Sequence, residues 1–351
     1  MTKQELAAKS GISARSLTWY ESGDRSPSTE SVRALATALR FPVSFFYRPD
    51  PPSISPDSAS FRSLAKMTAR QRDSALGSGE LAVELDDWFS RRFTRPDPQV
   101  PDLRELDPEA AAEAVRAEWR IGMRPIQNVL HLLEAHGVRV YSLTYEGREV
   151  DAFSLWRGDT PFIFLNTSPD KTAERLRFDA VHELGHLVLH RHGSPTGREA
   201  EAEADRFASA FLMPRADVIA HAPRYATPEV VIRLKQRWGV SAMALTYRLH
   251  SLGLISNWHY NQLCIHFRSK YGASEPAGMP RESSQALAKM LGALREEGVA
   301  RAKIAAELSM RPEDLDQLVF GLVLTGEKGG VGSTSPEGNG NPPTPKLTLI
   351  R

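Results

Sequence analysis

The sequence of 351 residues has little cysteine, no long apolar run and almost no excess charge. Its one cysteine, Cys264, excludes a disulfide framework and any metal site built from several thiolates. No segment reaches the roughly 20 apolar residues that a transmembrane helix needs, and no signal peptide or lipidation motif is recognisable. The formal net charge of +1 favours neither nucleic acid nor a membrane surface. We therefore expect a cytoplasmic protein with two or more domains and no membrane partner.

Two histidines that lie four residues apart, His182 and His186, form the pattern His-Glu-x-x-His with Glu183. On a helix, residues i and i+4 share a face, so both imidazoles can reach one metal ion. This is the zincin arrangement, which takes a third protein ligand and keeps an open position for water. Glu183 stands where it could accept a proton from that water during attack on a carbonyl group. The pattern also occurs by chance in unrelated chains, so its flanks decide how much it means.

Those flanks predict a buried helix. Ser168 and Pro169 are typical of an N-cap and a first helical residue, and Gly193 is typical of a helix end. Apolar residues recur at helical spacing between them. His190 cannot be the third ligand, because it lies two turns from His182, roughly 12 Å away at ~1.5 Å per residue.

The third ligand is expected in the acidic, alanine-rich residues 198–208, which predict a second helix. Glu201 and Asp205 are four residues apart and share a face. Glu201 could coordinate the metal, while Asp205 accepts a hydrogen bond from a ligand imidazole. Glu203 remains the alternative ligand at this point, although Glu199 and Glu203 also fit a solvated helix face.

Residues 1–48 predict a compact helix-turn-helix. Thr2 and Glu5 form a capping box, Gly11 makes the turn, and Ser13 caps a second short helix. This stretch is only mildly basic. Four prolines in the eight residues 49–56 then exclude a helix and indicate a linker.

The remaining pattern predicts a mainly α fold with a small antiparallel β-sheet, that is, an α+β architecture. Three strand-like runs at 138–143, 152–156 and 162–165 indicate an antiparallel meander, whose free edge could bind an extended peptide. The expected organisation, in chain order, is a helix-turn-helix (1–48), a proline-rich linker (49–59), a helical connector (60–107), a zincin-like metallopeptidase (108–225), a helical helix-turn-helix-like subdomain (226–280), C-terminal helices (281–325) and a disordered tail (326–351).

Several pieces between Pro161 and Pro214 together resemble the ImmA/IrrE metallopeptidases, a gluzincin-like group. They are Pro161-Phe162-Ile163-Phe164-Leu165-Asn166, Arg177-Phe178 followed by His182-Glu183-Leu184-Gly185-His186-Leu187 and Leu189-His190, then Glu201 with Glu203-Ala204-Asp205 and Phe207-Ala208, and Leu212-Met213-Pro214. The resemblance implies that His182, His186 and Glu201 are metal ligands, that Glu183 is the general base, and that Asp205 supports a ligand. The implied metal is zinc, and imidazole–carboxylate sites also accept manganese or iron.

Residues 1–48 resemble the phage-repressor (Cro/XRE-type) domain, including the run Tyr20-Glu21-x-Gly23-x-Arg25-x-Pro27. This resemblance implies DNA binding through Arg15, Ser16 and Trp19. The family normally has a further helix ahead of the position of Thr2, so we expect a unit without its first helix. The alternative is a protein-interaction module built on a DNA-binding ancestor.

Two functions from different classes follow. The first is a metal-dependent endopeptidase that cleaves a protein substrate, by resemblance a repressor-type regulator, as a regulatory or stress-response switch. The second is a DNA-binding transcriptional regulator whose zincin domain is a sensor or scaffold. An intact Glu183 favours the enzyme, because a scaffold does not need a base beside its ligands.

Overall fold

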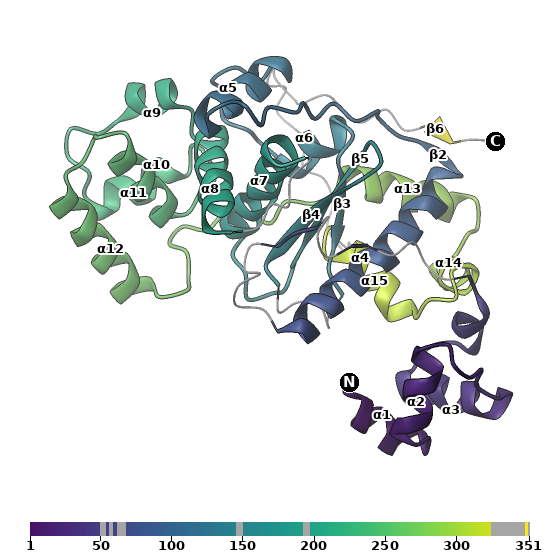
Figure 1. Ribbon diagram of the computed structural model, residues 1–351. Helices are drawn as coiled ribbons and strands as arrows, with labels where there is room; N and C mark the ends of the chain where they lie inside the picture. The colour runs from purple at the N-terminus through teal and green to yellow at the C-terminus, as the bar shows by residue number, and fades with distance from the viewer. Residues whose placement is uncertain are drawn as a thin grey trace, which may run out of the picture.

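The structure is a computed structural model that describes residues 1–49, 54–55, 59–61, 68–144, 150–191, 197–323 and 348–349. A small N-terminal helical unit lies beside a larger body in which helices surround a sheet (Figure 1). The prediction of a mainly helical fold that includes a small sheet is confirmed. Among the described residues, no helix combines the length and the apolar character needed to cross a membrane.

The N-terminal unit consists of α1 (Lys3–Ser10), α2 (Ala14–Glu21), α3 (Thr29–Leu39) and the 3-10 helix η1 (Val43–Tyr47). The predicted capping box is present, because the Thr2 hydroxyl accepts from the Glu5 amide and the Glu5 carboxylate accepts from the Thr2 amide. Gly11 follows α1 with a φ of 70°, which a glycine adopts without steric cost, and so permits the tight turn into α2. Leu17 on α2 and Val32 on α3 are buried in the small core of this unit.

The sheet contains β1 (Ala59–Phe61), β3 (Arg139–Ser142), β4 (Ala152–Arg157) and β5 (Thr160–Leu165), in the order β1-β4-β5-β3. β4 and β5 form the expected antiparallel hairpin. The prediction of an antiparallel meander is wrong for β3, which pairs with β5 in parallel. The chain leaves β3 at one edge and enters β4 on the far side of β5, so β3 and β4 are not neighbours.

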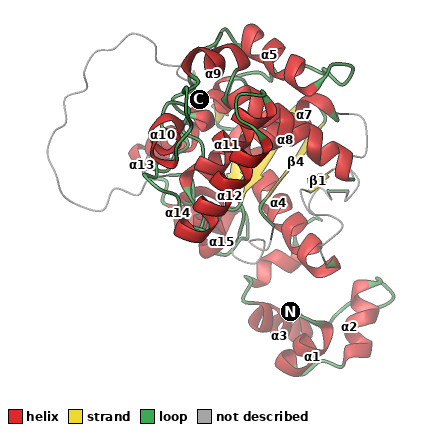
Figure 2. Cartoon of the chain, turned by 90° about the vertical axis from the view of Figure 1, so that its left-hand side faces the viewer, coloured by secondary structure: helices red, strands yellow, loops and turns green. Residues whose placement is uncertain are grey.

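Two helices, α4 (Ala69–Ser90) and α7 (Ala173–Leu189), cover opposite faces of the sheet (Figures 1 and 2). Alternate residues of a strand face opposite sides. Accordingly Phe153 lies against Gly79 of α4, while the next residue, Ser154, hydrogen-bonds Glu183 of α7. β4 therefore makes an apolar contact with α4 on one face of the sheet and a polar contact with α7 on the other.

The other helices surround this centre. They are α5 (Pro108–Glu118), α6 (Val129–Ala135), α8 (Arg198–Leu212), α9 (Arg215–His221), α10 (Pro228–Lys235), α11 (Ala242–Ser251), α12 (Asn257–Tyr271), α13 (Gln285–Glu296), α14 (Arg301–Glu307) and α15 (Pro312–Phe320). α8 packs closely on both α7 and α5. Its position beside α7 decides the geometry of the site.

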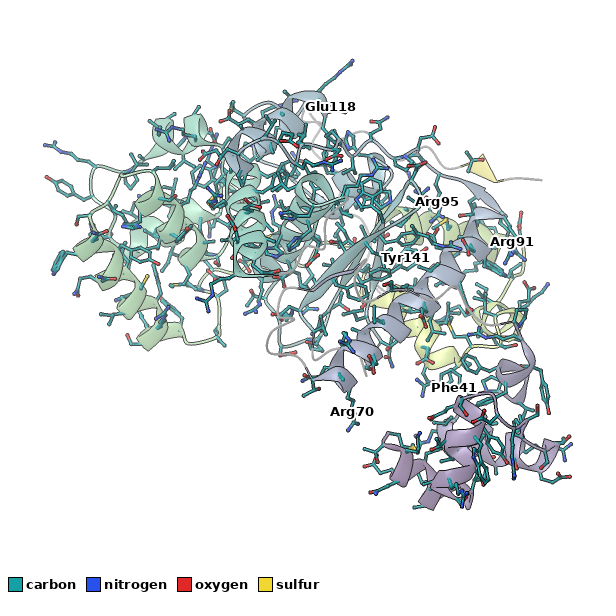
Figure 3. All side chains as sticks on the ribbon, in the orientation of Figure 1. Phe41, Arg70, Arg91, Arg95, Glu118 and Tyr141 are labelled. Carbon is teal, nitrogen blue, oxygen red and sulfur yellow. The ribbon has the colours of Figure 1, made fainter. Side chains whose placement is uncertain are left out.

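A buried polar network joins α4 to the sheet. Asp86 on α4 accepts a hydrogen bond from the Tyr141 hydroxyl at 2.8 Å and pairs with Arg95 at 2.5 Å. Tyr141 lies on β3, and Arg95 follows the two-residue strand β2 (Phe93–Thr94) (Figure 3). Because each charge has its partner, burial leaves no ion uncompensated in this network.

Three local predictions differ from the structure. α7 begins at Ala173 with Thr172 as its cap, because Ser168 and Pro169 form a turn closed by a hydrogen bond from the Lys171 amide to the Ser168 carbonyl. The helix ends at Leu189, and Gly193 lies outside the described residues.

The other two concern strands. The connector predicted as helical from residue 60 instead overlaps β1, and its helix starts at Ala69. Within the tail predicted as disordered, β6 (Thr348–Leu349) pairs antiparallel with β2, whereas residues 324–347 lie outside the described residues.

Candidate metal centre

The trio His182, His186 and Glu201 converges between α7 and α8. The two Nε2 atoms of His182 and His186 are 3.1 Å apart. The Glu201 carboxylate lies 3.5 Å from the first and 3.4 Å from the second. Both histidines are buried, and one ligand atom from each of the three residues lies within 4.8 Å of the others. The structure thus brings together the three residues that the family resemblance implied as ligands.

Small residues let α8 approach α7 closely enough for this. Gly185 lies between the two histidines on α7. A Cβ atom at Gly185 would come within 3.2 Å of the Ala204 Cα atom and 3.1 Å of the Phe207 ring. The missing side chain therefore sets the spacing at which Glu201 reaches the imidazoles.

A hydrogen bond on the side of His182 away from His186 and Glu201 decides which ring nitrogen faces those two residues. Its Nδ1 lies 2.9 Å from the Asp205 carboxylate, which can only accept when ionised, so Nδ1 carries the proton. The Nε2 lone pair then points inward. Glu201 Oε1 is buried without a hydrogen bond. Converging lone pairs and an unsatisfied carboxylate oxygen, held at tetrahedral-site spacing, suit a divalent cation.

His186 is supported differently, through a second histidine. His186 Nδ1 lies 3.1 Å from His190 Nδ1, and His190 Nε2 lies 2.9 Å from the Glu203 carboxylate. Glu203 accepts from His190 Nε2–H, so His190 Nδ1 is free to accept from His186 Nδ1–H. Of the two glutamates left open as the third ligand, Glu203 contacts His190, whereas Glu201 lies beside the Nε2 atoms of His182 and His186.

Ionisation states in the trio match what a cation requires. Burial lowers the pKa of His186 to about 4, against the opposing effect of the neighbouring Glu201 carboxylate. Burial would raise the pKa of Glu201, but the adjacent His182 and His186 imidazoles outweigh it and lower that pKa to about 2. At neutral pH the His186 imidazole is therefore neutral and Glu201 is ionised, which are the ligand forms that bind metal.

Glu183 lies on the neighbouring face of α7, fully buried beneath the sheet. Its Oε2 accepts a hydrogen bond of 2.7 Å from the Ser154 hydroxyl. Sequence reasoning missed Ser154. The available signal was a hydroxyl between Phe153 and Leu155 in an otherwise apolar strand, a position where a buried polar group needs a partner.

Peptide hydrolysis also needs a hydrogen-bond donor to the developing oxyanion, and histidine and tyrosine side chains after α8 are candidates by residue type. The contacts of four of them, His221, Tyr225, Tyr247 and His250, lie elsewhere. His221 hydrogen-bonds the Asp217 carbonyl, and His250 lies 2.5 Å from Asn257. Tyr225 and Tyr247 are exposed. Within the described part of the chain, these contacts connect none of the four residues to the trio.

A cavity of about 570 Å³ borders the N-terminal half of α7. It is lined by Phe178 and Asp179, one turn before His182, and by residues of α11 and α12. The cavity reaches neither His186 nor Glu201, but it offers space along the same helix.

The residues predicted to contact DNA share α2. Arg15 is exposed, and its guanidinium lies 4.7 Å from the centre of the Trp19 ring; Arg25 lies 4.0 Å from the same ring. The Ser16 hydroxyl is 2.9 Å from that of Ser13, the α2 cap. Arg15 on α2 and Arg25 in the turn that follows place two cations over the Trp19 ring, and so form a basic surface beside the second helix of the helix-turn-helix.

Comparison with known families agrees with both parts of the chain. Residues 133–250 match the Peptidase_M78 model, described as an IrrE N-terminal-like domain. Residues 1–46 match a helix-turn-helix model. A search of curated proteins found no match. The chain thus combines a region similar to the IrrE-like domain of the Peptidase_M78 family with an N-terminal region similar to helix-turn-helix domains, in agreement with the resemblance drawn from the sequence.

Proposed function

We propose that the protein is a metal-dependent endopeptidase in which His182, His186 and Glu201 bind a zinc ion. The observation that carries this proposal is the convergence of the two Nε2 atoms and the Glu201 carboxylate beside a buried, oriented Glu183. Two imidazoles and one carboxylate suit zinc, and the same donor set also accepts manganese or iron.

The chain's own groups divide the chemistry of peptide hydrolysis. When bound, the metal supplies Lewis-acid polarisation of the scissile carbonyl and lowers the pKa of water. Glu183 accepts a proton from the attacking water and delivers it to the leaving amine as the C–N bond breaks. Ser154 orients the Glu183 carboxylate, and Asp205 orients the His182 ring.

The substrate we propose is a protein, specifically a repressor-type transcriptional regulator, whose cleavage acts as a regulatory switch. The support is the helix-turn-helix domain in the same chain, which could bind the same operator or the same repressor. For that domain we propose DNA contacts by Arg15, Ser16 and Trp19.

A second candidate is a DNA-binding regulator in which the metal centre is only a sensor or scaffold. The basic surface around Trp19 favours this function. A regulator of this kind would keep its activity without Glu183, whereas an endopeptidase would lose peptide cleavage.

A peptide-library assay separates the two. The zinc-loaded full chain and its Glu183→Gln variant are incubated with peptides derived from a whole proteome, and new termini are identified by mass spectrometry. We expect cleavage by the wild type and a loss of at least roughly a thousandfold in Glu183→Gln, which keeps the shape of the side chain but not its basicity. New termini that appear equally with both proteins would contradict the proposal.

A further inference from the structure

The outer edge of β4 is already paired with another segment of the chain. On its inner side β4 pairs with β5, and on its outer side with β1, antiparallel. The register places Ala59 opposite Leu155, Ser60 opposite Ser154 and Phe61 opposite Phe153. The free strand edge expected from the sequence is therefore covered by residues that link the helix-turn-helix to α4.

This edge lies directly beside the proposed general base. Ser154 donates hydrogen bonds to the Glu183 carboxylate at 2.7 Å and to the Glu183 carbonyl at 3.3 Å. Neighbouring strands lie roughly 4.7–4.9 Å apart, so the backbone of residue 60 passes one strand spacing from Ser154. An extended peptide that pairs with this edge would use the same backbone groups.

We propose that residues 59–61 are a built-in occupant of the edge on which an extended substrate pairs, and that they must leave β4 before substrate binds. The inference rests on the proposed endopeptidase function and adds the regulation of its site. β1 and a substrate strand compete for one row of backbone donors and acceptors, so only one of them can be bound.

The lengths of the two strands favour exchange. β1 covers three residues of β4, whose six residues run from Ala152 to Arg157. A peptide that matches the whole strand forms more ladder hydrogen bonds than β1 does. The internal occupant has the advantage of being tethered, which keeps its effective concentration high.

Contacts on α4 connect this occupant to the N-terminal unit. Arg48, at the end of that unit, pairs with Glu84 at 2.6 Å, and the Ile54 amide donates to Glu80 at 3.1 Å. The segment that reaches β4 is thus fastened twice to α4. A partner that displaces the N-terminal unit from these contacts would pull β1 from the edge.

Proline substitutions test the occupancy without catalysis. In an antiparallel ladder alternate residues donate to the partner strand, so either Ser60→Pro or the pair Ala59→Pro/Phe61→Pro removes ladder donors. Both are made in the Glu183→Gln background, with Ser60→Ala as the matched control. Hydrogen–deuterium exchange is followed at residues 153–155, with α13 as an internal reference for intact folding.

A labelled peptide with the sequence of residues 57–65, added in trans, is the binding probe. In at least one proline variant, we expect the amides of residues 153–155 to exchange at least about tenfold faster than in the Glu183→Gln parent. The same variant should bind the peptide at least about tenfold more tightly, whereas Ser60→Ala should change neither quantity. Unchanged exchange and binding in both proline variants would overturn the inference.

The catalytic form then separates this inference from the function on which it rests. The same proline variants are therefore also made with Glu183 intact and tested in the peptide-library assay. If they bind the peptide more tightly but cleave nothing, the endopeptidase function is rejected, whereas the inference that β1 occupies the edge of β4 stands. Glu183-dependent cleavage of the wild-type chain itself between residues 56 and 67 would make this segment a substrate, and would overturn its role as a lasting occupant.

Discussion

The two histidines of the proposed centre depend on different outer partners. His182 reaches a carboxylate, Asp205, directly, whereas His186 reaches Glu203 through His190. Metal-binding histidines generally need such a partner to fix the ring and its tautomer. Because His190 offers Nδ1 as an acceptor, it orients His186 without being a ligand.

Removing that acceptor should weaken metal binding. We expect His190→Leu to lower zinc affinity by roughly 10–100-fold, the usual effect of losing an outer partner. His190→Asn should restore most of it, because the asparagine side-chain oxygen can occupy the position of Nδ1. Competition with a chromophoric chelator measures the affinity, and thermal unfolding of the metal-free variants controls for general damage. Equal zinc affinities for wild type and the His190→Leu variant, at matched stability, would contradict this role for His190.

The stability of the metal-free protein should depend on pH through His186. Its pKa falls from 6.5 to about 4 on burial, so the unfolded state binds the proton more readily. The free energy of unfolding should therefore rise as pH increases from about 4 to 6.5, by on the order of 3 kcal/mol from this residue, and then level off. Urea titrations compare wild type with His186→Gln. If the difference in unfolding free energy between the two proteins stays constant across this pH range, His186 is not the source of the pH dependence.

At the scale of elements, the site depends on the close contact of α7 with α8. Gly185→Ala should weaken zinc binding, because the new Cβ atom pushes on Ala204 and Phe207 and moves Glu201 away. Alanine is nevertheless the better helix former, by up to ~1 kcal/mol. Gly292→Ala on α13 is the matched control, since nothing lies within 4 Å of its Cβ position, and it should be neutral or stabilising. Zinc titration and thermal unfolding of both variants check this; unchanged zinc affinity in Gly185→Ala would argue against spacing as the cause.

Local sequence patterns predicted much of these elements. The helical spacing around His182, the four-residue step from Glu201 to Asp205 and the Thr2 cap all identify structure that depends on neighbouring residues. The predicted start of α7 at Ser168 was wrong. Serine and threonine favour both turns and helix N-caps, and here Ser168 lies in the turn while Thr172 is the cap.

Long-range pairings were beyond the same reasoning. The parallel register of β3 with β5 and the pairing of β1 with β4 depend on chain paths that a strand pattern does not encode. Ser154 and His190 likewise gained a role only when α7 met β4 and α8. The sequence could therefore identify the three residues that converge between α7 and α8, but not the side chains that contact them from other elements.

At the scale of the whole molecule, side chains in the described part of the chain connect the helix-turn-helix to the body. Arg48 bonds Glu84 and the Leu308 carbonyl, and Arg311 lies 4.7 Å from the centre of the Phe41 ring. Phe41 points from the N-terminal unit toward the body (Figure 3). Interfaces between the domains of one chain generally allow relative motion unless they are large and apolar.

Cutting these contacts should extend the molecule. We expect Arg48→Ala/Arg311→Ala to increase the radius of gyration in small-angle X-ray scattering, because it removes an ion pair, a carbonyl contact and a cation–π contact together. Arg33→Ala, on an exposed part of α3, is the control and should leave the radius unchanged. A double variant as compact as wild type would show that other contacts hold the unit in place.

Metal content of the purified chain tests the central claim most directly. We predict one equivalent of zinc in wild type, in Glu183→Gln and in Glu199→Ala, an exposed neighbour on α8, and its loss in His182→Ala and Glu201→Ala. Inductively coupled plasma mass spectrometry after dialysis gives the count. Zinc retained in Glu201→Ala, or a wild type that takes up neither zinc nor manganese, would contradict the account.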